Sequence, residues 1–355
     1  MFPIADLFFT DKKIAGIDLG SNSLKLVEIA DSSGGYELKH WAEMPLERGI
    51  IENGLIKNQD ILSKKIRELI KESKSLAKKA AIALSGHTVV VKKTSFRNMD
   101  DEELRQLITD EAGQFLPFED SGDIEFDCHI IGDNLLNPEQ MDVIVAAARK
   151  DVIKNYTHAI EKAGHKVAIL DVDLFALQTA FERNYDLEAN DVVALIHMGA
   201  GMTGINVVRG ENSVFTRSIP MGGDTITEAI MRSKSIPFEE AEKIKCDVSA
   251  GTGDLREDVL EFAGPILGEI ERTIDYFTIE LGGMTVANVM LSGGCARIPG
   301  IVDRLSDVLR ADVKIMNPFK NIKYDKKVFS DATIEKIGPV AVIGVGLALR
   351  RVDDL

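Results

Sequence analysis

A meander of short strands near the start of this chain restricts its fold more than any other feature, because the meander occurs twice. The first copy consists of "IAGIDLG" (14–20), "LKLVEIA" (24–30) and "YELKHWAEM" (36–44). These segments are rich in apolar and β-branched residues and are separated by polar turns, which is the pattern of three antiparallel strands. A run with helical spacing of apolar residues follows at 58–77.

The second copy lies 179 residues further on (197 − 18), with His197 at the strand end that corresponds to Asp18. Its segments, in the same order, are "VVALIHM", "TGINVV" and "SVFTRSI", and a helix is expected from about Asp224. Two copies of one plan, each followed by helices, predict two similar α/β domains that face each other. We place the first domain at 1–190 and the second at 191–355.

The first domain is predicted to carry a small inserted module at about 88–165. Its expected elements are a strand at 89–96, a helix at 101–115, strands at 124–131 and 141–148, a helix at 151–163 and a strand at 165–171. This β-α-β-β-α-β order can close as one small α+β unit. A module inserted in a duplicated scaffold is a natural place for a partner protein to bind.

Composition narrows the possible functions. The net charge of −15, from 42 basic and 57 acidic residues, disfavours non-specific nucleic-acid binding, which depends on Lys and Arg neutralising phosphates. The three cysteines are far apart and form no CxxC pair, as in reduced cytosolic proteins. The segment 1–10 lacks the basic start of a signal peptide, and the longest apolar run, 339–349, is too short to cross a membrane. We expect a cytoplasmic protein that meets the membrane only through a partner, and a tightly packed core helix at 339–349.

The turn "GAGMTG" (199–204) formally matches the dinucleotide motif GxGxxG. That motif needs a helix directly after the turn, so that the helix N-terminus meets the pyrophosphate. Here "INVVRGENSVF" follows, which is β-branched and broken by another turn, so a dehydrogenase is disfavoured. The sequence contains no GxxxxGK[ST] loop, which excludes a P-loop NTPase.

Two hairpin turns that face each other can still hold phosphates. Backbone amides of the turns 20–23 and 199–201 would converge as anion-binding nests. Lys25 would reach a β- or γ-phosphate as a point charge, and Asp18 would organise water around Mg²⁺. Either turn alone is more typical of an ordinary hairpin beside a surface lysine, but the duplication reverses this and favours the phosphate site.

A third glycine-rich stretch, "VMLSGGCARIPG" (289–300), predicts a buried strand that ends in a glycine pair and is followed by a helix. Gly293 and Gly294 would let the backbone approach a planar ring or a sugar without a Cβ in the way. Glu242 and Lys245 lie one helical turn apart and could bracket a ribose and a base. The same spacing is also typical of a solvent-facing ion pair.

In this order the motifs resemble the actin/Hsp70/FtsA superfamily of nucleotide-binding proteins. "GIDLGSNSLK" resembles its first phosphate loop, "LIHMGAGMTGI" its second, "RSIPMGGDTIT" the glycine pair that follows, and "LSGGCARIPG" its adenosine motif. The resemblance covers essentially the whole chain. It implies an actin-like ATPase fold, with two duplicated RNase H-like domains that close on ATP and Mg²⁺.

Within that superfamily, the stretches "GIDLGSNSLKLVEI", "PLERGIIENGLIKN", "VIVAAARKDVI" and "DVDLFALQTAF" resemble the PilM family of type IV pilus assembly proteins. This resemblance implies a cytoplasmic ATP-binding scaffold of the machine for twitching motility, at most a weak ATPase. It also implies a partner, the N-terminal cytoplasmic tail of the inner-membrane protein PilN, held in a groove of the first domain. Through PilN the protein would join an alignment complex with PilO and PilP and lie at the inner membrane.

The superfamily motifs carry over residue by residue. The nucleotide contacts that the resemblance implies are Asp18, Ser21, Asn22, Ser23, Lys25, Gly199, Ala200, Gly201, Met202, Gly222, Gly223, Glu242, Lys245, Gly293, Gly294, Arg297 and Ile298. Asp18 is also the expected Mg²⁺ residue, acting through water. Asp173 falls near the position of the superfamily's water-orienting residue and is the candidate catalytic residue, with Asp171 as a competing candidate.

His197 departs from the superfamily pattern, which usually has Asp at this place. A neutral imidazole cannot replace a carboxylate beside hydrated Mg²⁺, whereas a protonated one would contact a phosphate oxygen. The simpler alternative is a strand-end histidine bonded to the backbone. Either way, efficient hydrolysis is not expected. The rival functions are an active enzyme of the superfamily, such as a sugar kinase or an exopolyphosphatase, and an FtsA-like filament protein.

The helix expected at 58–77 has a basic face. Its lysines are Lys64, Lys65, Lys71, Lys74, Lys78 and Lys79. Such a face is usually solvated, and contact with lipid headgroups is the alternative.

Overall fold

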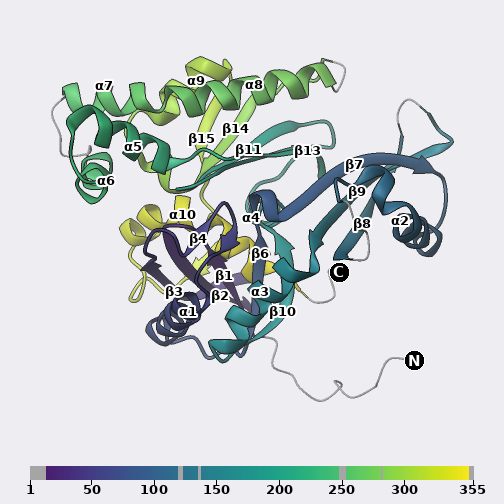
Figure 1. Cartoon of the computed structure of the whole chain (residues 1–355), viewed down its shortest axis with the longest axis horizontal. Coiled ribbons are helices and arrows are strands. Elements are labelled where there is room, and N and C mark those ends of the chain that lie inside the picture. Colours follow the sequence, from purple (N-terminus) through teal and green to yellow (C-terminus); the bar gives the residue numbers. More distant parts are fainter. Residues whose placement is uncertain (1–12, 119–122, 135–136, 248–252, 281–282, 352–355) are drawn as a thin grey trace.

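The computed structural model describes residues 13–118, 123–134, 137–247, 253–280 and 283–351. Two mixed sheets form its centre, one from each copy of the meander, and an arm projects from one side (Figure 1). The N-terminal segment considered above for a signal peptide lies outside the described residues.

The first sheet contains the first meander and two parallel strands beside it. Its spatial order is β10 (Lys166–Val172), β6 (Lys79–Leu84), β1 (Ile14–Leu19), β2 (Ser23–Ser32), β3 (Gly35–Pro45) and β16 (Ile322–Tyr324). The strands β1, β2 and β3 pair antiparallel, whereas β6 pairs in parallel with both β1 and β10. A two-stranded ribbon, β4 (Ile51–Glu52) and β5 (Leu55–Ile56), follows the meander.

The second sheet repeats this plan. Its order is β13 (Asn212–Ile219), β12 (Thr203–Arg209), β11 (Val192–Met198), β14 (Asn288–Ser292) and β15 (Asp312–Ile315). Within each sheet the third strand of the meander is followed by the second and the first, and then by two strands parallel to the first. The internal duplication predicted from the sequence is therefore confirmed.

Helices lie in three layers around the two sheets. On the outer face of the first sheet are α1 (Gln59–Ser73) and α3 (Lys150–Lys162), whose apolar faces pack against Ile17 and Leu26. The outer face of the second sheet is covered by α5 (Gly223–Lys234), α6 (Phe238–Asp247), α7 (Gly253–Phe262), α8 (Gly264–Glu280) and α9 (Ile301–Leu309). Between the sheets lie α4 (Asp173–Glu182) and α10 (Asp331–Leu349), which share one core with Val27, Leu195 and Val208.

The projecting arm is smaller than the inserted module predicted from the sequence. It consists of β7 (Val89–Arg97), α2 (Asp101–Phe115), β8 (Ile124–Asp133) and β9 (Gln140–Arg149), in a sheet of order β7-β9-β8. The prediction that α3 and β10 close this module is wrong, because β10 pairs with β6 and α3 packs on α1. The buried face of α3, which includes Tyr156 and Ile160, finds its apolar partners on the main body.

The end of the chain returns to the first sheet. Residues 322–324 pair in parallel with β3, and α10 packs against β1 and β2, although the sequence placed both segments in the second domain. Gly16 permits the close packing on β1, since a Cβ there would lie 2.3 Å from the carbonyl oxygen of Gly344. Gly346 permits equally close packing of α10 on α4, since a Cβ there would lie 1.8 Å from the carbonyl oxygen of Ala176. The burial of α10 confirms the core helix predicted at 339–349. By length and composition α10 alone among the described helices could cross a membrane, and 78% of its apolar window is buried inside the protein.

Candidate functional site

The two predicted phosphate loops are the tips of equivalent hairpins. In the first, Asp18 lies opposite Lys25 across β1 and β2, and in the second, His197 lies opposite Gly204 across β11 and β12. Each loop leads directly into a strand, not into a helix. This geometry confirms that "GAGMTG" is not a dinucleotide motif.

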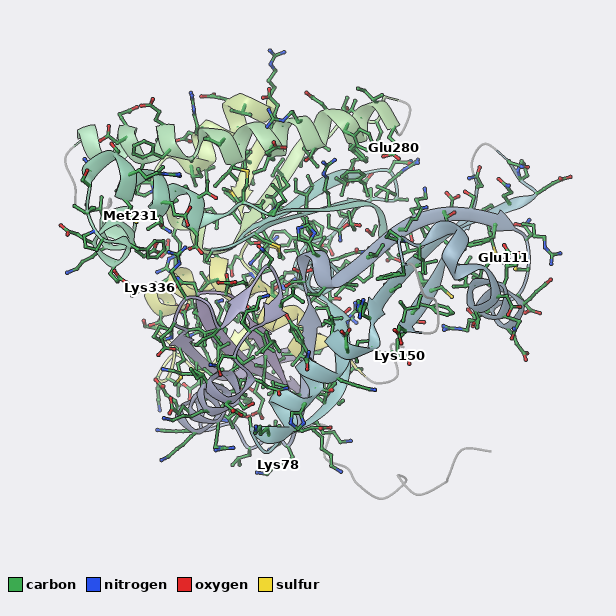
Figure 2. The ribbon with its side chains drawn as sticks, in the orientation of Figure 1. Lys78, Glu111, Lys150, Met231, Glu280 and Lys336 are labelled. Carbon is green, nitrogen blue, oxygen red and sulfur yellow. The ribbon has the colours of Figure 1, made fainter. Side chains whose placement is uncertain are left out.

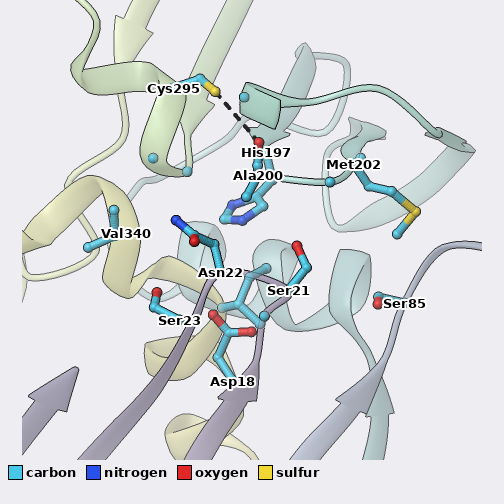
Figure 3. A pocket seen from close by; sticks show the side chains of 18 of the residues that line it. Asp18, Ser21, Asn22, Ser23, Ser85, His197, Ala200, Met202, Cys295 and Val340 are labelled. Carbon is cyan, nitrogen blue, oxygen red and sulfur yellow. Dashed lines mark hydrogen bonds between the residues drawn. The ribbon is translucent and has the colours of Figure 1, made fainter. Parts of the chain in front are cut away.

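The hairpin tips meet in the cleft between the two sheets. A Cβ on Gly201 would lie 3.2 Å from the hydroxyl oxygen of Ser21, so the two loops are almost in contact. Figure 3 shows Ser21 and Asn22 facing His197 and Ala200 across the space between the loops. The chain thus brings together two turns that are 179 residues apart in sequence.

The loops enclose a cavity of about 300 Å³. Every nucleotide contact predicted from the sequence lines this cavity except Gly222, and Asp173 lines it too. Sequence reasoning missed several other lining residues, among them Glu43, Asn53, Ser85, Ser218, Val340 and Ile343. Asn53 could have been suspected from the turn "ENG", but Val340 and Ile343 come from α10, whose return to the cleft has no local signal.

Four backbone amides at the loop tips have no backbone acceptor within the described residues: those of Ser21, Asn22, Ala200 and Gly201. The start of α5 holds the second loop in this orientation. The amides of Gly223 and Asp224 donate to the carbonyl oxygens of Gly199 and Ala200, at 2.9 and 2.8 Å. The loop carbonyls are thereby turned away, and the unpaired amides form the kind of nest that binds anions.

Gly222 supports this arrangement without lining the cavity. A Cβ there would lie 2.4 Å from the carbonyl oxygen of Ala200. The residue therefore has to be glycine for α5 to approach the second loop. Its predicted role as a direct nucleotide contact is not supported by its position.

Lys25 and Asp18 form an ion pair inside the cavity. The Lys25 Nζ lies 3.1 Å from the Asp18 Oδ2, and both side chains are largely buried. The sequence predicted separate roles for these residues, with the lysine on phosphate and the carboxylate beside Mg²⁺. In the structure each is the other's partner.

His197 is half-buried at the end of β11 and bonds to a side chain, not to the backbone. Its Nδ1 lies 3.0 Å from the Ser292 hydroxyl, which also lies 3.2 Å from the carbonyl oxygen of Ile196. Burial lowers the pKa of His197 to about 4, with Lys25 acting in the same direction and Asp18 opposing it. The imidazole is therefore neutral near pH 7, and the protonated phosphate contact considered from the sequence does not apply to this state.

Of the two candidate aspartates, Asp173 lines the loop cavity and Asp171 does not. Asp171 lies outside the loop cavity and forms a bidentate ion pair with Arg350. The Arg350 Nε lies 2.7 Å from Asp171 Oδ2, and the Arg350 Nη2 lies 3.4 Å from Asp171 Oδ1. Asp173 begins α4 and faces the cavity. Burial raises the pKa of the Asp173 carboxyl to about 7, and the neighbouring Asp18 and Asp171 add to the effect. Asp173 is thus the carboxyl poised to exchange a proton near neutral pH.

The expected adenosine side of the cavity is built around Glu242 and Lys245. Lys245 is buried, and its Nζ lies 2.7 Å from Glu242 Oε2 and donates to Thr227 Oγ1 at 2.8 Å and to the carbonyl oxygen of Gly223 at 3.0 Å. Burial opposes ionisation of Glu242, but the ion pair outweighs it and holds the pKa of this carboxyl below its usual value. The alternative of a solvent-facing pair is therefore wrong.

The glycine pair closes the same side. Gly293 has φ of +90°, and a Cβ there would lie 2.3 Å from the carbonyl oxygen of Met198. Both constraints require glycine at this position. The strand β14 ends just before it, and α9 begins just after Gly300, as the sequence predicted.

A second cavity, of about 790 Å³, lies between the arm and the main body. Its walls include the strands β8 and β10, each of which is the edge of its sheet. The apolar part of its lining includes Val89, Ile144, Leu170 and Phe175. Six carboxylates and two arginines also line it, and both arginines are already paired with carboxylates. We call this cavity the arm groove.

The helix α4 connects the two cavities. Asp173 at its start faces the loop cavity, whereas Phe175, Gln178 and Glu182 line the arm groove. Gln178 also bonds to the second sheet, since its Oε1 accepts a hydrogen bond from Asn206 Nδ2 of β12 at 3.1 Å. One rigid element therefore contacts both sites and both halves of the molecule.

Two duplicated sheets, with hairpin loops that converge in the cleft between them, define a protein of the actin-like ATPase fold. The chain belongs to the family of the type IV pilus assembly protein PilM, whose family model matches residues 16–352.

Solved structures and characterised relatives agree with this assignment. A PilM–PilN type IV pilus biogenesis complex matches with a TM-score of 0.85 and 26% identity, over 95% of this chain and 98% of that one. The ethanolamine utilization protein EutJ from Carboxydothermus hydrogenoformans matches with a TM-score of 0.58 and 19% identity, over 94% and 88% of the two chains. The cell division protein FtsA of Bacillus subtilis is 29% identical over 191 residues, which are 48% of this chain and 43% of FtsA. The chain thus spans less than half of that relative.

Proposed function

We propose that this protein is a cytoplasmic ATP-binding scaffold of type IV pilus assembly, which holds nucleotide in the loop cavity and the N-terminal tail of PilN in the arm groove. Through PilN it would join an alignment complex with PilO and PilP at the inner membrane. The observation that carries the nucleotide half is the set of four unpaired amides on two converging loops. Family membership carries the pilus half.

The residues of the loop cavity fit a nucleoside triphosphate. Ser21, Asn22, Ala200 and Gly201 present amides for phosphate oxygens, and the glycine pair leaves room for a ring. The ion pair between Lys25 and Asp18 would open when phosphates arrive, because the lysine gains a more highly charged partner.

Mg²⁺ fits less completely. When bound, the ion would offset phosphate charge, and Asp18 would hold it through water. The equivalent position in the other loop holds His197, which is neutral and brings no negative charge. This asymmetry supports a protein that holds ATP and hydrolyses it slowly at most.

The arm groove suits an extended peptide. Free edges on β8 and β10 can accept an added strand, with main-chain hydrogen bonds giving affinity and side-chain pockets giving specificity. Because six carboxylates and only two arginines line the groove, and both arginines are already paired with carboxylates, an apolar segment that carries a basic residue is favoured. A solved PilM–PilN complex matches 95% of this chain.

Nucleotide binding and peptide binding would be coupled through α4. Closure of the two halves on ATP would act on Asp173 at one end of this helix and shift Phe175 and Gln178 along it. The coupling is reciprocal, so the peptide would change the affinity for ATP by the same factor as ATP changes the affinity for the peptide.

Two measurements test this proposal separately. Calorimetry of protein stripped of endogenous nucleotide should show binding of ATP with Mg²⁺, and no binding would remove the nucleotide half. A labelled peptide matching the partner's N-terminal tail should bind the protein alone. Ile131→Glu, in the arm groove, should weaken peptide binding at least tenfold, whereas Val328→Glu, which is remote and 65% exposed, should not. Equal effects of the two variants would remove the groove assignment.

One observation favours the rival hypothesis that the protein is an active enzyme of the superfamily, such as a sugar kinase or an exopolyphosphatase. Asp173 has the raised pKa that a general base or acid needs near neutral pH. Steady ATP turnover with a sugar or polyphosphate, lost in Asp173→Asn, would establish that rival. Filament formation would instead appear as nucleotide-dependent sedimentation.

A further inference from the structure

A concentration of positive charge in this acidic chain lies near the edge of the first sheet, outside the loop cavity. Residues 59–79 contain seven basic and three acidic side chains, a net of +4, in a chain whose total is −15. The basic face predicted on the helix at 58–77 is part of it. The prediction that Lys74, Lys78 and Lys79 lie on that helix is wrong, because α1 ends at Ser73: Lys74 and Lys78 lie in the turn after it and Lys79 begins β6.

Five lysines form this surface, which we call the basic edge. They are Lys71, Lys74, Lys78, Lys79 and Lys166, and all five are exposed. They come from the end of α1, the turn after it, and the first residues of β6 and β10. Figure 2 shows Lys78 at the rim of the molecule opposite α7 and α8.

The sheet holds two of these charges side by side. Lys79 and Lys166 are register partners on adjacent parallel strands, and the amide of Lys166 donates to the carbonyl oxygen of Lys78 at 3.0 Å. Like charges in neighbouring register positions repel each other. No ion pair offsets this repulsion, since within the described residues none of the five lysines has a carboxylate partner. Other lysines of the same layer do have one, as Lys65 has with Glu47.

An exposed apolar side chain lies within the basic edge. Leu76 is 71% exposed in the turn between α1 and β6, with Lys74 before it and Lys78 after it. No packing role explains an exposed leucine at this place, and the lysines around it are themselves unpaired. Lysines around a protruding apolar side chain suit a surface that is anionic outside and apolar just beneath, which is the interface of an anionic bilayer.

The basic edge is also continuous with the arm groove. The helix α3 and the strand β10 contribute Ile153 and Leu170 to the groove, and Lys166 begins the same strand β10 at the basic edge. A peptide in the groove that emerges from a membrane protein would bring this side of the molecule near the bilayer.

We propose that the basic edge docks directly on anionic phospholipid, with Leu76 entering the headgroup layer. This contact goes beyond the proposed link through PilN and needs no partner. The overall charge of −15 does not prevent it, because only charges within about one Debye length, roughly 10 Å, act strongly on the surface. The five lysines lie together, and most carboxylates are elsewhere.

Vesicle flotation of the full chain tests this inference without any PilN peptide. The protein should float with vesicles of phosphatidylcholine containing about one-third phosphatidylglycerol, and not with phosphatidylcholine alone. Each lysine near the surface contributes about fivefold to binding, so the triple variant Lys74→Glu, Lys78→Glu, Lys79→Glu should lose at least tenfold. A control triple variant at exposed lysines elsewhere, Lys243→Glu, Lys327→Glu, Lys336→Glu, changes the net charge equally and should float like the wild type.

Leu76 gives an independent readout. Fluorescence of Leu76→Trp should shift to the blue when anionic vesicles are added, whereas a residue that stays in water would show no shift. Salt of about 1 M, where the Debye length is about 3 Å, should release the wild type. No flotation at low salt, equal flotation of both triple variants, or binding to phosphatidylcholine alone would each overturn the inference. Binding of nucleotide and of the PilN peptide is measured separately, so failure here leaves the proposed function untouched.

Discussion

The neutral state of His197 makes a quantitative prediction about stability and pH. An unfolded histidine has a pKa of 6.5, and burial lowers the pKa of His197 to about 4 in the folded protein. Above pH 6.5 both states are neutral and the residue has no effect. Between pH 6.5 and 4, His197 binds a proton in the unfolded state but not in the folded state. The free energy of unfolding therefore falls as the pH falls.

The magnitude follows from the difference between the two pKa values. One unit of pKa difference corresponds to about 1.36 kcal/mol, so a difference of about 2.5 units makes the full loss at low pH about 3 kcal/mol. Between pH 7.5 and 5.5, which stays above the isoelectric point of about 5.0, the loss is about 1 kcal/mol.

The matched variant is His197→Asn. Its amide can keep the bond that His197 Nδ1 makes with Ser292, and it does not titrate. Urea unfolding of nucleotide-free protein, followed by the fluorescence of the single tryptophan, Trp41, should be measured for both proteins at the two pH values. The wild type should lose about 1 kcal/mol more than the variant. Groups common to both proteins cancel, including Asp173, whose raised pKa acts in the opposite direction over the same pH range.

Parallel pH curves for the two proteins would refute this reasoning. That result would mean that His197 is protonated about as easily in the folded protein as in the unfolded chain. A cationic histidine facing phosphates would then become the better description of the second loop.

Three further predictions concern the cavity and the core. His197→Asp restores a carboxylate at the second loop, and phosphate release from ATP with Mg²⁺ should rise at least tenfold; a rate no higher than that of the wild type would show that His197 does not limit hydrolysis. Lys25→Met should weaken ATP binding by about 10- to 100-fold, the usual effect of losing one bond to a charged group, and leave AMP binding unchanged, as calorimetry can check; equal losses for both nucleotides would contradict a role on the outer phosphates. Gly346→Ala should lower the midpoint of thermal unfolding by an amount equivalent to about 1–3 kcal/mol or more, because its Cβ would overlap the Ala176 carbonyl. In Gly268→Ala the nearest atom would be 3.8 Å away, so this control should be neutral or stabilising, and a similar fall in both variants would contradict the packing argument.

Local patterns were sufficient for the elements that depend on neighbours in sequence. The helix predicted at 101–115 and the strand predicted at 192–198 have those same bounds in the structure. The helix expected at 58–77 ends earlier, at Ser73, because Lys74 takes a left-handed conformation with φ of +58°. Ile61 has the apolar spacing of that helix, but its side chain is 41% exposed.

The sequence by itself determined that the chain is duplicated and that two hairpin loops and a glycine pair form one site, because β-turns and strand alternation are encoded within a few residues. Only the tertiary structure decided which partners the polar groups of that site take. Lys25 forms an ion pair with Asp18, Asp171 forms an ion pair with Arg350, and Asp173 faces the cavity. Those outcomes depend on desolvation and on contacts between segments as much as 179 residues apart, as for Asp171 and Arg350, and no local pattern specifies them.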